Sequence, residues 1–319
     1  MAKIALVLGA GGLTGQAFHA GVLAGLVDGL GWDARTADLI VGTSAGATAG
    51  AYIRVGLSAA DGVAVLKGAP TSPEGARIMG RLGEQGDWRT PVGPRSLPRP
   101  PRRDLLRRLA TRPWEVRPET VLAVSLPPGR VPPETWTDAL HGVTGPGWTD
   151  APLWVCAVRV EDGHRVVFGR AGSPAADLAT AVGASSAIPG YFRPVEIDGQ
   201  RYVDGAAHSA TNADLVIPER PDLVVVSSPM SVARSALSLD LRTAGRLHFR
   251  RRLATEVRRL RTAGIPVVAF QPSHDDRVAM GGDTMAEGRN AVVVDQAYAT
   301  TLRRVARPEI ARRLAALTG

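Results

Sequence analysis

The first sixty residues alternate between short aliphatic runs and glycine-dense turns, and this alternation limits the fold more than any other sequence feature. Ile4–Leu8 is an aliphatic run that ends at glycine, which is typical of a buried strand. Gly9–Gly15 forms the turn that follows. Gln16–Leu30 then carries apolar residues at every fourth position, which predicts a helix packed along one face.

The same pattern repeats once before residue 60. Asp38–Val41 predicts a second short strand, Gly42–Gly46 a tight turn, and Ala47–Val55 a helix of small residues. Strands that alternate with helices in this way form a mostly parallel sheet with helices on both faces. We therefore predict an α/β protein with a three-layer α/β/α architecture.

Residues 68–150 interrupt this pattern. They are rich in Pro, Gly and Arg, most of all in Pro94–Arg103, and we interpret them as a cap or insertion over the sheet. The whole chain, residues 1–319, is accordingly predicted to be one domain. Further strands are expected at Leu153–Val160, His164–Phe168, Val195–Ile197, Arg201–Val203, Leu223–Ser227 and Val267–Phe270, and helices at Ala175–Ser185 and Leu241–Thr262.

Composition excludes several classes of protein. Hydrophobic residues make up 45% of the chain and charged residues 21%, which excludes wholesale disorder. Cys156 is the single cysteine, so an intrachain disulfide and a C-x-x-C metal site are excluded, and a buried structural thiol is expected. No apolar run reaches the roughly 18 residues of a membrane-spanning helix. The run after Lys3 is too short for a signal peptide, so we expect an unprocessed cytoplasmic chain.

The charge of the chain is strongly positive. The formal net charge is +8, and 36 of the 38 basic residues are arginines. Many of them lie in Leu241–Thr262, where a solvated basic face is the simplest interpretation and contact with an anionic membrane surface is the functional alternative. Trp114, Trp136 and Trp148 are either interfacial anchors or the core of the cap. Nucleic-acid binding is not expected, because no recognition motif accompanies the arginines.

Ser44 carries the strongest chemical signal. It is the centre of a G-x-S-x-G motif that directly follows a predicted strand and directly precedes a predicted helix. Gly42 and Gly46 lack a Cβ, so the chain can turn sharply and present the serine at the carboxyl edge of the sheet. The alternative is an ordinary strand–helix turn with a capping serine.

The first glycine turn supplies hydrogen-bond donors. The amides of Gly11 and Gly12 open a helix and form a cavity suited to an oxyanion. A dinucleotide site is the rival interpretation, since Gly9, Gly12 and Gly15 have the spacing of a reductase-type turn. In a dinucleotide site, an acidic or basic residue that contacts the ribose should end the second strand. Here the Ser44 motif follows that strand directly. None of the four tyrosines precedes a lysine by four residues, as such a reductase would need.

Asp204 is the second half of the predicted site. It follows a predicted strand and precedes Gly205, so its carboxyl group is expected at a strand end. A plain Asp-Gly turn is the alternative. A histidine base would require His208, His248 or His274, in the chain order of α/β-hydrolases. Those enzymes, however, place the serine motif after several strands and not after two.

Four blocks of the sequence together resemble the patatin-like phospholipase family and follow the family's order. They are Gly9–Gly15 with His19–Leu23, Gly42–Gly46, Ala184–Phe192 and Val203–Ala206. The resemblance covers roughly residues 4–60 and 151–300. It implies a three-layer α/β/α fold and a Ser–Asp dyad that hydrolyses acyl esters of lipids without a catalytic histidine. Carried over by position, Ser44 is the nucleophile, Asp204 the base, and the amides of Gly11 and Gly12 the oxyanion hole.

The chain departs from the family's pattern in a few places. Ala10 stands where the family usually has glycine, and Thr14 stands where it usually has Arg or Lys, which removes a charge near the oxyanion. Ala206 replaces a commoner glycine, and residues 68–150 have no clear counterpart. Thr14 and His208 are further candidates for lining the site. His19 is expected to be structural and Asn212 to fix the loop after Asp204.

The sequence thus predicts a serine ester hydrolase of phospholipase A or esterase type that works through an acyl-enzyme. It requires no metal and no organic cofactor, and its partner is a lipid or another acyl ester. One alternative is a small-ester or thioester hydrolase with the same dyad. Another is a catalytically weak binding protein with a patatin fold.

Overall fold

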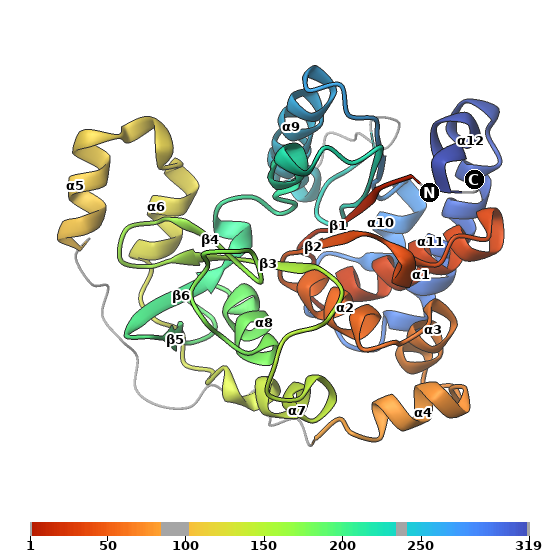
Figure 1. The fold of residues 1–319 in the computed structure, drawn as a ribbon, viewed down its shortest axis with the longest axis horizontal. Helices are drawn as coiled ribbons and strands as arrows, with labels where there is room; N and C mark the ends of the chain where they lie inside the picture. The colour runs from red at the N-terminus through yellow and green to blue at the C-terminus, as the bar shows by residue number, and fades with distance from the viewer. Residues whose placement is uncertain (1, 84–101, 234–240, 318–319) are drawn as a thin grey trace.

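The computed structural model describes residues 2–83, 102–233 and 241–317. One eight-stranded sheet runs through this part of the chain (Figure 1). The strands are β1 (Ile4–Leu8), β2 (Leu39–Gly42), β3 (Leu153–Arg159), β4 (Arg165–Phe168), β5 (Val195–Ile197), β6 (Gln200–Asp204), β7 (Leu223–Ser227) and β8 (Val267–Phe270). Their order is β5-β6-β3-β2-β1-β7-β8, and β4 pairs with β3 outside this path. From β3 to β8 all neighbours are parallel, whereas β4, β5 and β6 pair antiparallel, which confirms the mostly parallel sheet.

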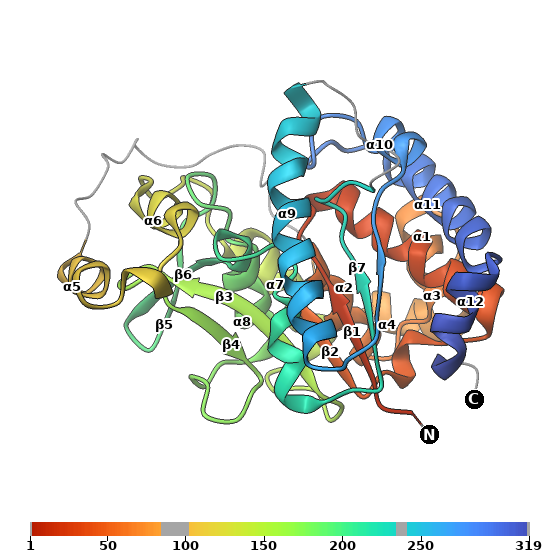
Figure 2. The ribbon, with the colours of Figure 1, turned by 90° about the horizontal axis from the view of Figure 1, so that it is seen from above.

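Helices cover both faces of the sheet and give the molecule three layers (Figures 1 and 2). The helices α1 (Gly12–Leu30), α2 (Ala45–Arg54), α8 (Leu178–Ser186) and α11 (Asn290–Val305) pack on one face. The other face carries α9 (Leu241–Thr262) and the 3₁₀ helix η4 (Ala213–Glu219). Side chains of β1 alternate between these two cores, with Leu6 in the first and Val7 in the second. The predicted α/β/α architecture is confirmed.

Shorter helices complete the described chain. They are α3 (Ala59–Lys67), α4 (Pro73–Met79), α5 (Arg103–Thr111), α6 (Pro118–Ser125), α7 (Glu134–Thr144), α10 (His274–Met280) and α12 (Pro308–Leu314), with the 3₁₀ turns η1 (Ala34–Thr36), η2 (Pro113–Glu115), η3 (Gly205–Ala207) and η6 (Ala315–Leu317). Within the described residues, no helix combines the length and the apolar character that crossing a membrane requires.

Three helix starts differ from the sequence prediction, and the smallest difference is at α2, which begins at Ala45 and not at Ala47. α1 begins at Gly12 and not at Gln16, because the carbonyl of Gly11 already accepts the N–H of Gly15 (2.9 Å) and starts the helical ladder inside the glycine turn. α8 begins at Leu178 and not at Ala175. There the side chain of Asp177 caps the first turn by accepting the N–H of Thr180 (2.9 Å).

The Pro- and Arg-rich segment, residues 68–150, contributes α4 to α7. Its most extreme stretch, within Pro94–Arg103, lies almost wholly outside the described residues. The helices α5 and α6 stand beyond the β4–β6 end of the sheet, and α7 lies beside α8 (Figure 1). A parallel bridge between Val131 and Phe192 ties the segment to the loop after α8.

Candidate active site

Ser44 lies at the sharp turn between β2 and α2. Its backbone has φ 55° and ψ −122°, a strained conformation for a residue with a side chain. Glycines on both sides make the turn sterically feasible. A Cβ at Gly42 would lie 2.5 Å from the Cα of Ala47, and a Cβ at Gly46 would overlap the carbonyl oxygen of Leu8. The G-x-S-x-G motif therefore lets α2 begin directly against β1.

Asp204 is the last residue of β6, and the sheet topology brings it to the Ser44 turn. Val155 pairs with both β2 and β4, and Val158 pairs with both β4 and β6. A strand has two edges, so β2 and β6 must share the edge of β3 that β4 leaves free. Because β2 is parallel and β6 antiparallel to β3, their carboxyl ends face each other, with Gly42 opposite Val155 and Asp204 opposite Ala157.

Ser185 fills the gap between these two strand ends. Its Oγ donates to the carbonyl of Cys156 (2.6 Å), the β3 residue between the two pairings, and accepts the N–H of Ser44 (2.9 Å). The Ser185 hydroxyl thereby provides the hydrogen bond that the Cys156 carbonyl would otherwise accept from a neighbouring strand. It also fixes the backbone of the turn at Ser44. Burial raises the pKa of the Cys156 thiol to about 12, as expected for a structural cysteine.

The carboxyl group of Asp204 is poised for proton transfer. The residue is 4% exposed, and Ser44 is 5% exposed. Burial raises the pKa of Asp204 to about 6, and hydrogen bonds from the Ala206 N–H (2.8 Å) and the Ser44 hydroxyl oppose this rise. The carboxyl group is thus ionised at neutral pH but more basic than an exposed aspartate.

The glycine turn after β1 carries free hydrogen-bond donors, and its Gly12 and Leu13 line the same pocket as Ser44. Within the described part of the chain, the N–H groups of Gly11, Gly12 and Leu13 have no hydrogen-bond acceptor. Gly12 has φ 62°, and a Cβ there would lie 2.6 Å from the carbonyl oxygen of Thr284, so glycine is required. These donors lie at the N-terminus of α1, where the helix dipole favours negative charge.

A pocket of about 140 Å³ opens directly above Ser44. Its lining is mostly apolar and comes from five parts of the chain: Gly12, Leu13, Gln16, Ser44, Ala45, Thr48, Tyr52, Trp136, Leu140, Ser186, Ile188, Phe192 and Met285. No sequence motif pointed to α7 or to the turn at Met285 as part of the site. Trp136 is therefore a pocket residue, whereas Trp148 packs against the main core and donates to the carbonyl of Leu153 (3.1 Å).

Thr14 and His208 do not line this pocket. Thr14 is fully buried, and its N–H donates to the carbonyl of Thr284 (3.2 Å). His208 lies near Arg117 and Arg165, and its carbonyl accepts a hydrogen bond from Arg117. Burial, together with these two cations, lowers the pKa of His208 to about 2, so its imidazole is neutral.

His19 is a structural residue, as expected. Its ring nitrogens bond the carbonyl of Gly9 and the Oγ of Ser227, each at 2.7 Å. These two contacts tie the glycine turn to the end of β7. Burial lowers the pKa of His19 to about 4, although the contact with Gly9 raises it, so the ring stays neutral.

Asn212 joins the loop after Asp204 to the serine turn. Its Nδ2 donates to the carbonyl of Ser209 (2.7 Å) and to the Oγ1 of Thr43 (3.1 Å), the residue before Ser44. This confirms the expectation that Asn212 fixes the loop, and it connects both halves of the site. The contact to Thr43 could not be read from the sequence, because 169 positions separate the two residues.

Glu256 of α9 holds the same loop from the opposite side. Its carboxylate accepts the hydroxyls of Ser209 and Thr211, each at 2.5 Å, and the N–H of Ala213 (3.0 Å). Glu256 is 1% exposed and is the only acidic residue within Leu241–Thr262. An isolated carboxylate among arginines was thus the one signal that the sequence offered for this contact.

Comparison with known proteins places the chain in context. The family model for patatin-like phospholipases matches residues 6–217. Among solved structures, a crystal structure of VipD from Legionella pneumophila is similar, at 12% sequence identity and a TM-score of 0.41. That match covers 95% of this chain and 66% of the VipD chain. This chain therefore spans less than two thirds of the length of VipD. No curated protein matches the chain.

Proposed function

The chain belongs to the patatin-like phospholipase family, and we propose that it is a lipid acyl hydrolase of phospholipase A or esterase type. The observation that carries this proposal is the buried Ser44 hydroxyl close to the buried Asp204 carboxyl, beside unpaired backbone donors and an apolar pocket. Nucleophile, base, donors and pocket are the parts that acyl transfer requires.

The reaction proceeds through two half-reactions. Asp204 accepts the hydroxyl proton as the Oγ of Ser44 attacks the ester carbonyl carbon, and the tetrahedral intermediate collapses as Asp204 returns that proton to the leaving alcohol. Water then attacks the acyl-enzyme and gives its proton to Asp204. Collapse of the second intermediate releases the fatty acid, and the proton returns to Ser44.

The amides of Gly11 and Gly12 stabilise the oxyanion in both steps. Loss of one such donor typically costs about 10²–10³ in rate. Thr14 replaces the family's usual cation, so the helix dipole of α1 and the backbone amides carry this stabilisation without a charged side chain.

Covalent labelling tests the dyad directly. The intact mass of the protein is measured after incubation with a lipid-like fluorophosphonate, which traps activated serines. We expect one adduct in the wild type, none in Ser44→Ala, and labelling slower by about 10³ in Asp204→Asn. Folded wild-type protein that forms no adduct would refute the proposal and favour the catalytically weak binding protein. Labelling without hydrolysis of any carboxylic ester would favour a thioester hydrolase.

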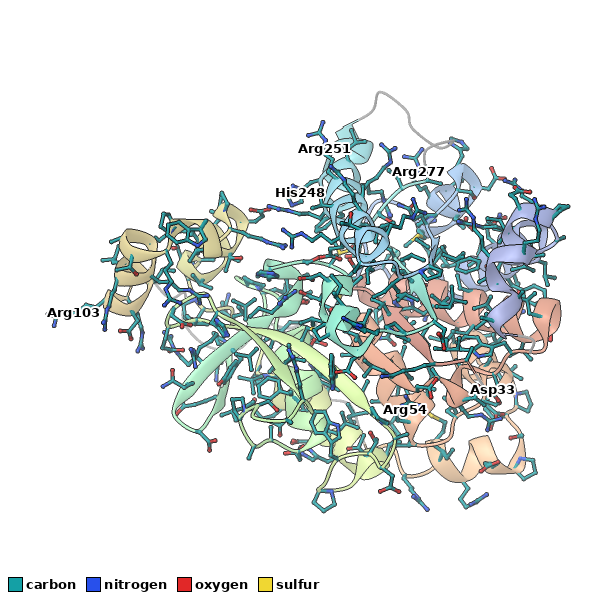
Figure 3. The ribbon with its side chains drawn as sticks, turned by 45° about the horizontal axis from the view of Figure 1, so that its top comes forward. Asp33, Arg54, Arg103, His248, Arg251 and Arg277 are labelled. Atoms are coloured by element: carbon teal, nitrogen blue, oxygen red, sulfur yellow. The ribbon has the colours of Figure 1, made fainter. Side chains whose placement is uncertain are left out.

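We also propose peripheral contact with anionic membrane surfaces. Trp114 in η2, Leu106 in α5 and Leu122 in α6 are 79%, 52% and 67% exposed. Arginines surround them, and Arg103 projects from the outer end of α5 in Figure 3. Exposed aromatic and aliphatic side chains among basic residues suit the boundary between headgroups and acyl chains.

A further inference from the structure

A second cavity, of about 220 Å³, lies beside the active-site pocket between α1, α2 and α3. Its walls are largely apolar and include Leu23, Ile53, Leu57 and Leu66. Asp33 and Arg35 are the charged residues among its lining, and they pair with each other at 2.6 Å. The cavity therefore offers hydrocarbon a large apolar surface without an uncompensated charge.

The two cavities share part of their walls. Gln16 of α1 and Tyr52 of α2 line both of them. Along α2, Ser44, Thr48 and Tyr52 follow at intervals of four residues, so they lie on one face of the helix. The helix that begins at the nucleophile thus leads from the active-site pocket to the second cavity.

The length of this path sets the size of a matching ligand. Nine residues separate Ser44 from Ile53, which at about 1.5 Å per residue is about 13 Å. An extended acyl chain advances about 1.3 Å per carbon, because its C–C bonds are about 1.5 Å long. A chain of about ten carbons would therefore reach from the Ser44 Oγ to the part of the cavity that Ile53 lines.

We propose that this cavity, here called the acyl pocket, binds the distal half of the substrate's acyl chain and selects medium-length chains. Gln16 and Tyr52 form the collar between the acyl pocket and the pocket at Ser44. The inference rests on the proposed function, since it assigns the acyl chain of the ester that Ser44 attacks. The protein would therefore select its substrate by the acyl group and not by the head group.

Gly62 offers a way to fill the acyl pocket without disturbing the fold. It lines the cavity from α3, and a Cβ added there meets no atom within 4 Å. Its φ is not positive, so a leucine is compatible with the backbone and favours the helix more than glycine does. Ala60→Leu is the matched control, because it makes a leucine on the exposed face of the same helix.

The test compares ester hydrolysis across acyl chains from butanoate to hexadecanoate. Each methylene buried in the acyl pocket should raise kcat/KM about fourfold, up to about decanoate. In Gly62→Leu the rise should stop about three carbons earlier, so the decanoate-to-butanoate ratio falls about sixtyfold. Ala60→Leu should match the wild type. Hydrolysis with an unchanged chain-length profile in Gly62→Leu would overturn the acyl pocket while leaving the proposed function intact.

A binding measurement separates this inference from catalysis. Titration of decanoate into Ser44→Ala, with and without Gly62→Leu, reports the acyl pocket without any turnover. Binding that Gly62→Leu abolishes and Ala60→Leu retains supports the acyl pocket, even if no ester is hydrolysed and the proposed function fails. The acyl pocket is overturned if decanoate does not bind, or if it binds equally well to Ser44→Ala with and without Gly62→Leu.

Discussion

At the level of single residues, the proposed chemistry depends on how basic the Asp204 carboxyl group is. Burial raises its pKa to about 6, against the hydrogen bonds from Ala206 and Ser44. A base must be deprotonated to act, so activity should fall as the pH drops through this value.

We therefore expect kcat/KM for a soluble ester to show an acid limb with an apparent pKa near 6. Rates should be constant above this limb and fall tenfold per pH unit well below it. Initial rates in constant-ionic-strength buffers check this. An acid limb near the ordinary pKa of aspartate, with the protein still folded, would contradict the assignment of Asp204 as a buried base.

The same shift predicts an effect on stability. The folded-state pKa of Asp204, about 6, lies above the ordinary value of 3.8, so the free energy of unfolding falls as pH rises between these values. Asn cannot ionise, and its Oδ1 can still accept the Ala206 N–H. Asp204→Asn should therefore be more stable than the wild type above pH 6, by up to about 3 kcal/mol, but not at pH 4. Urea unfolding at both pH values measures the difference, and an equal gain at both would contradict it.

At the level of elements, the strands were the most predictable part of the fold. Leu223–Ser227 and Val267–Phe270 match the sequence prediction at both ends, because short aliphatic runs buried on both faces have clear boundaries. The start of α1 was missed, since Gly11 at the N-cap and Gly12 and Gly15 in the first turn oppose helix formation by local propensity alone. Contacts with β7 and the Thr284 turn stabilise that start instead.

The positions of Ser44 and Asp204, the residues of the proposed dyad, could be predicted because Ser44 closely follows the end of β2 and Asp204 ends β6, each within a recognisable motif. Most contacts that fix these two residues could not be predicted. Asn212 was expected to fix the loop after Asp204, but its bond to Thr43 and the bonds of Ser185 and Glu256 are long-range, and Met285 reaches the pocket from a turn without a motif. Such contacts depend on the tertiary fold, which local sequence patterns do not encode.

The contact between Asn212 and Thr43 leads to a prediction about how the two loops are coupled. Thr43→Val removes the hydroxyl that accepts from Asn212, whereas Thr43→Ser keeps it. We expect Thr43→Val to lower kcat about tenfold or more with little change in KM, because a misaligned nucleophile affects the transition state more than binding. Thr43→Ser should retain most of the activity. Full activity in Thr43→Val together with a loss in Thr43→Ser would show that the methyl packing of Thr43 matters and the hydrogen bond does not.

At the level of the whole molecule, two features are combined. The protein has a net charge of +8, and several large apolar side chains are exposed on its surface. The helices α6 and α9 are joined by an ion pair between Glu119 and Arg252 and by a contact between Glu119 and His248. Figure 3 labels His248 and Arg251 on α9, and the contacts of His248 and Arg252 with Glu119 place basic groups of α9 next to α6. An anionic membrane is the partner that such a surface would attract, and salt should weaken that attraction.

This predicts selective, salt-sensitive binding to anionic vesicles. Co-sedimentation with phosphatidylglycerol vesicles should exceed that with phosphatidylcholine vesicles, and the difference should shrink in high salt. Trp114→Ala should weaken partitioning about tenfold through lost apolar burial, and Arg103→Glu should weaken it several-fold through charge. Val292→Ala, at a valine 60% exposed on α11, is the matched control and should bind like the wild type. Hydrolysis of a soluble ester should be unchanged in all three variants, because none of these side chains lines the pocket at Ser44. Equal binding by Trp114→Ala and Val292→Ala would place the membrane contact elsewhere on the protein.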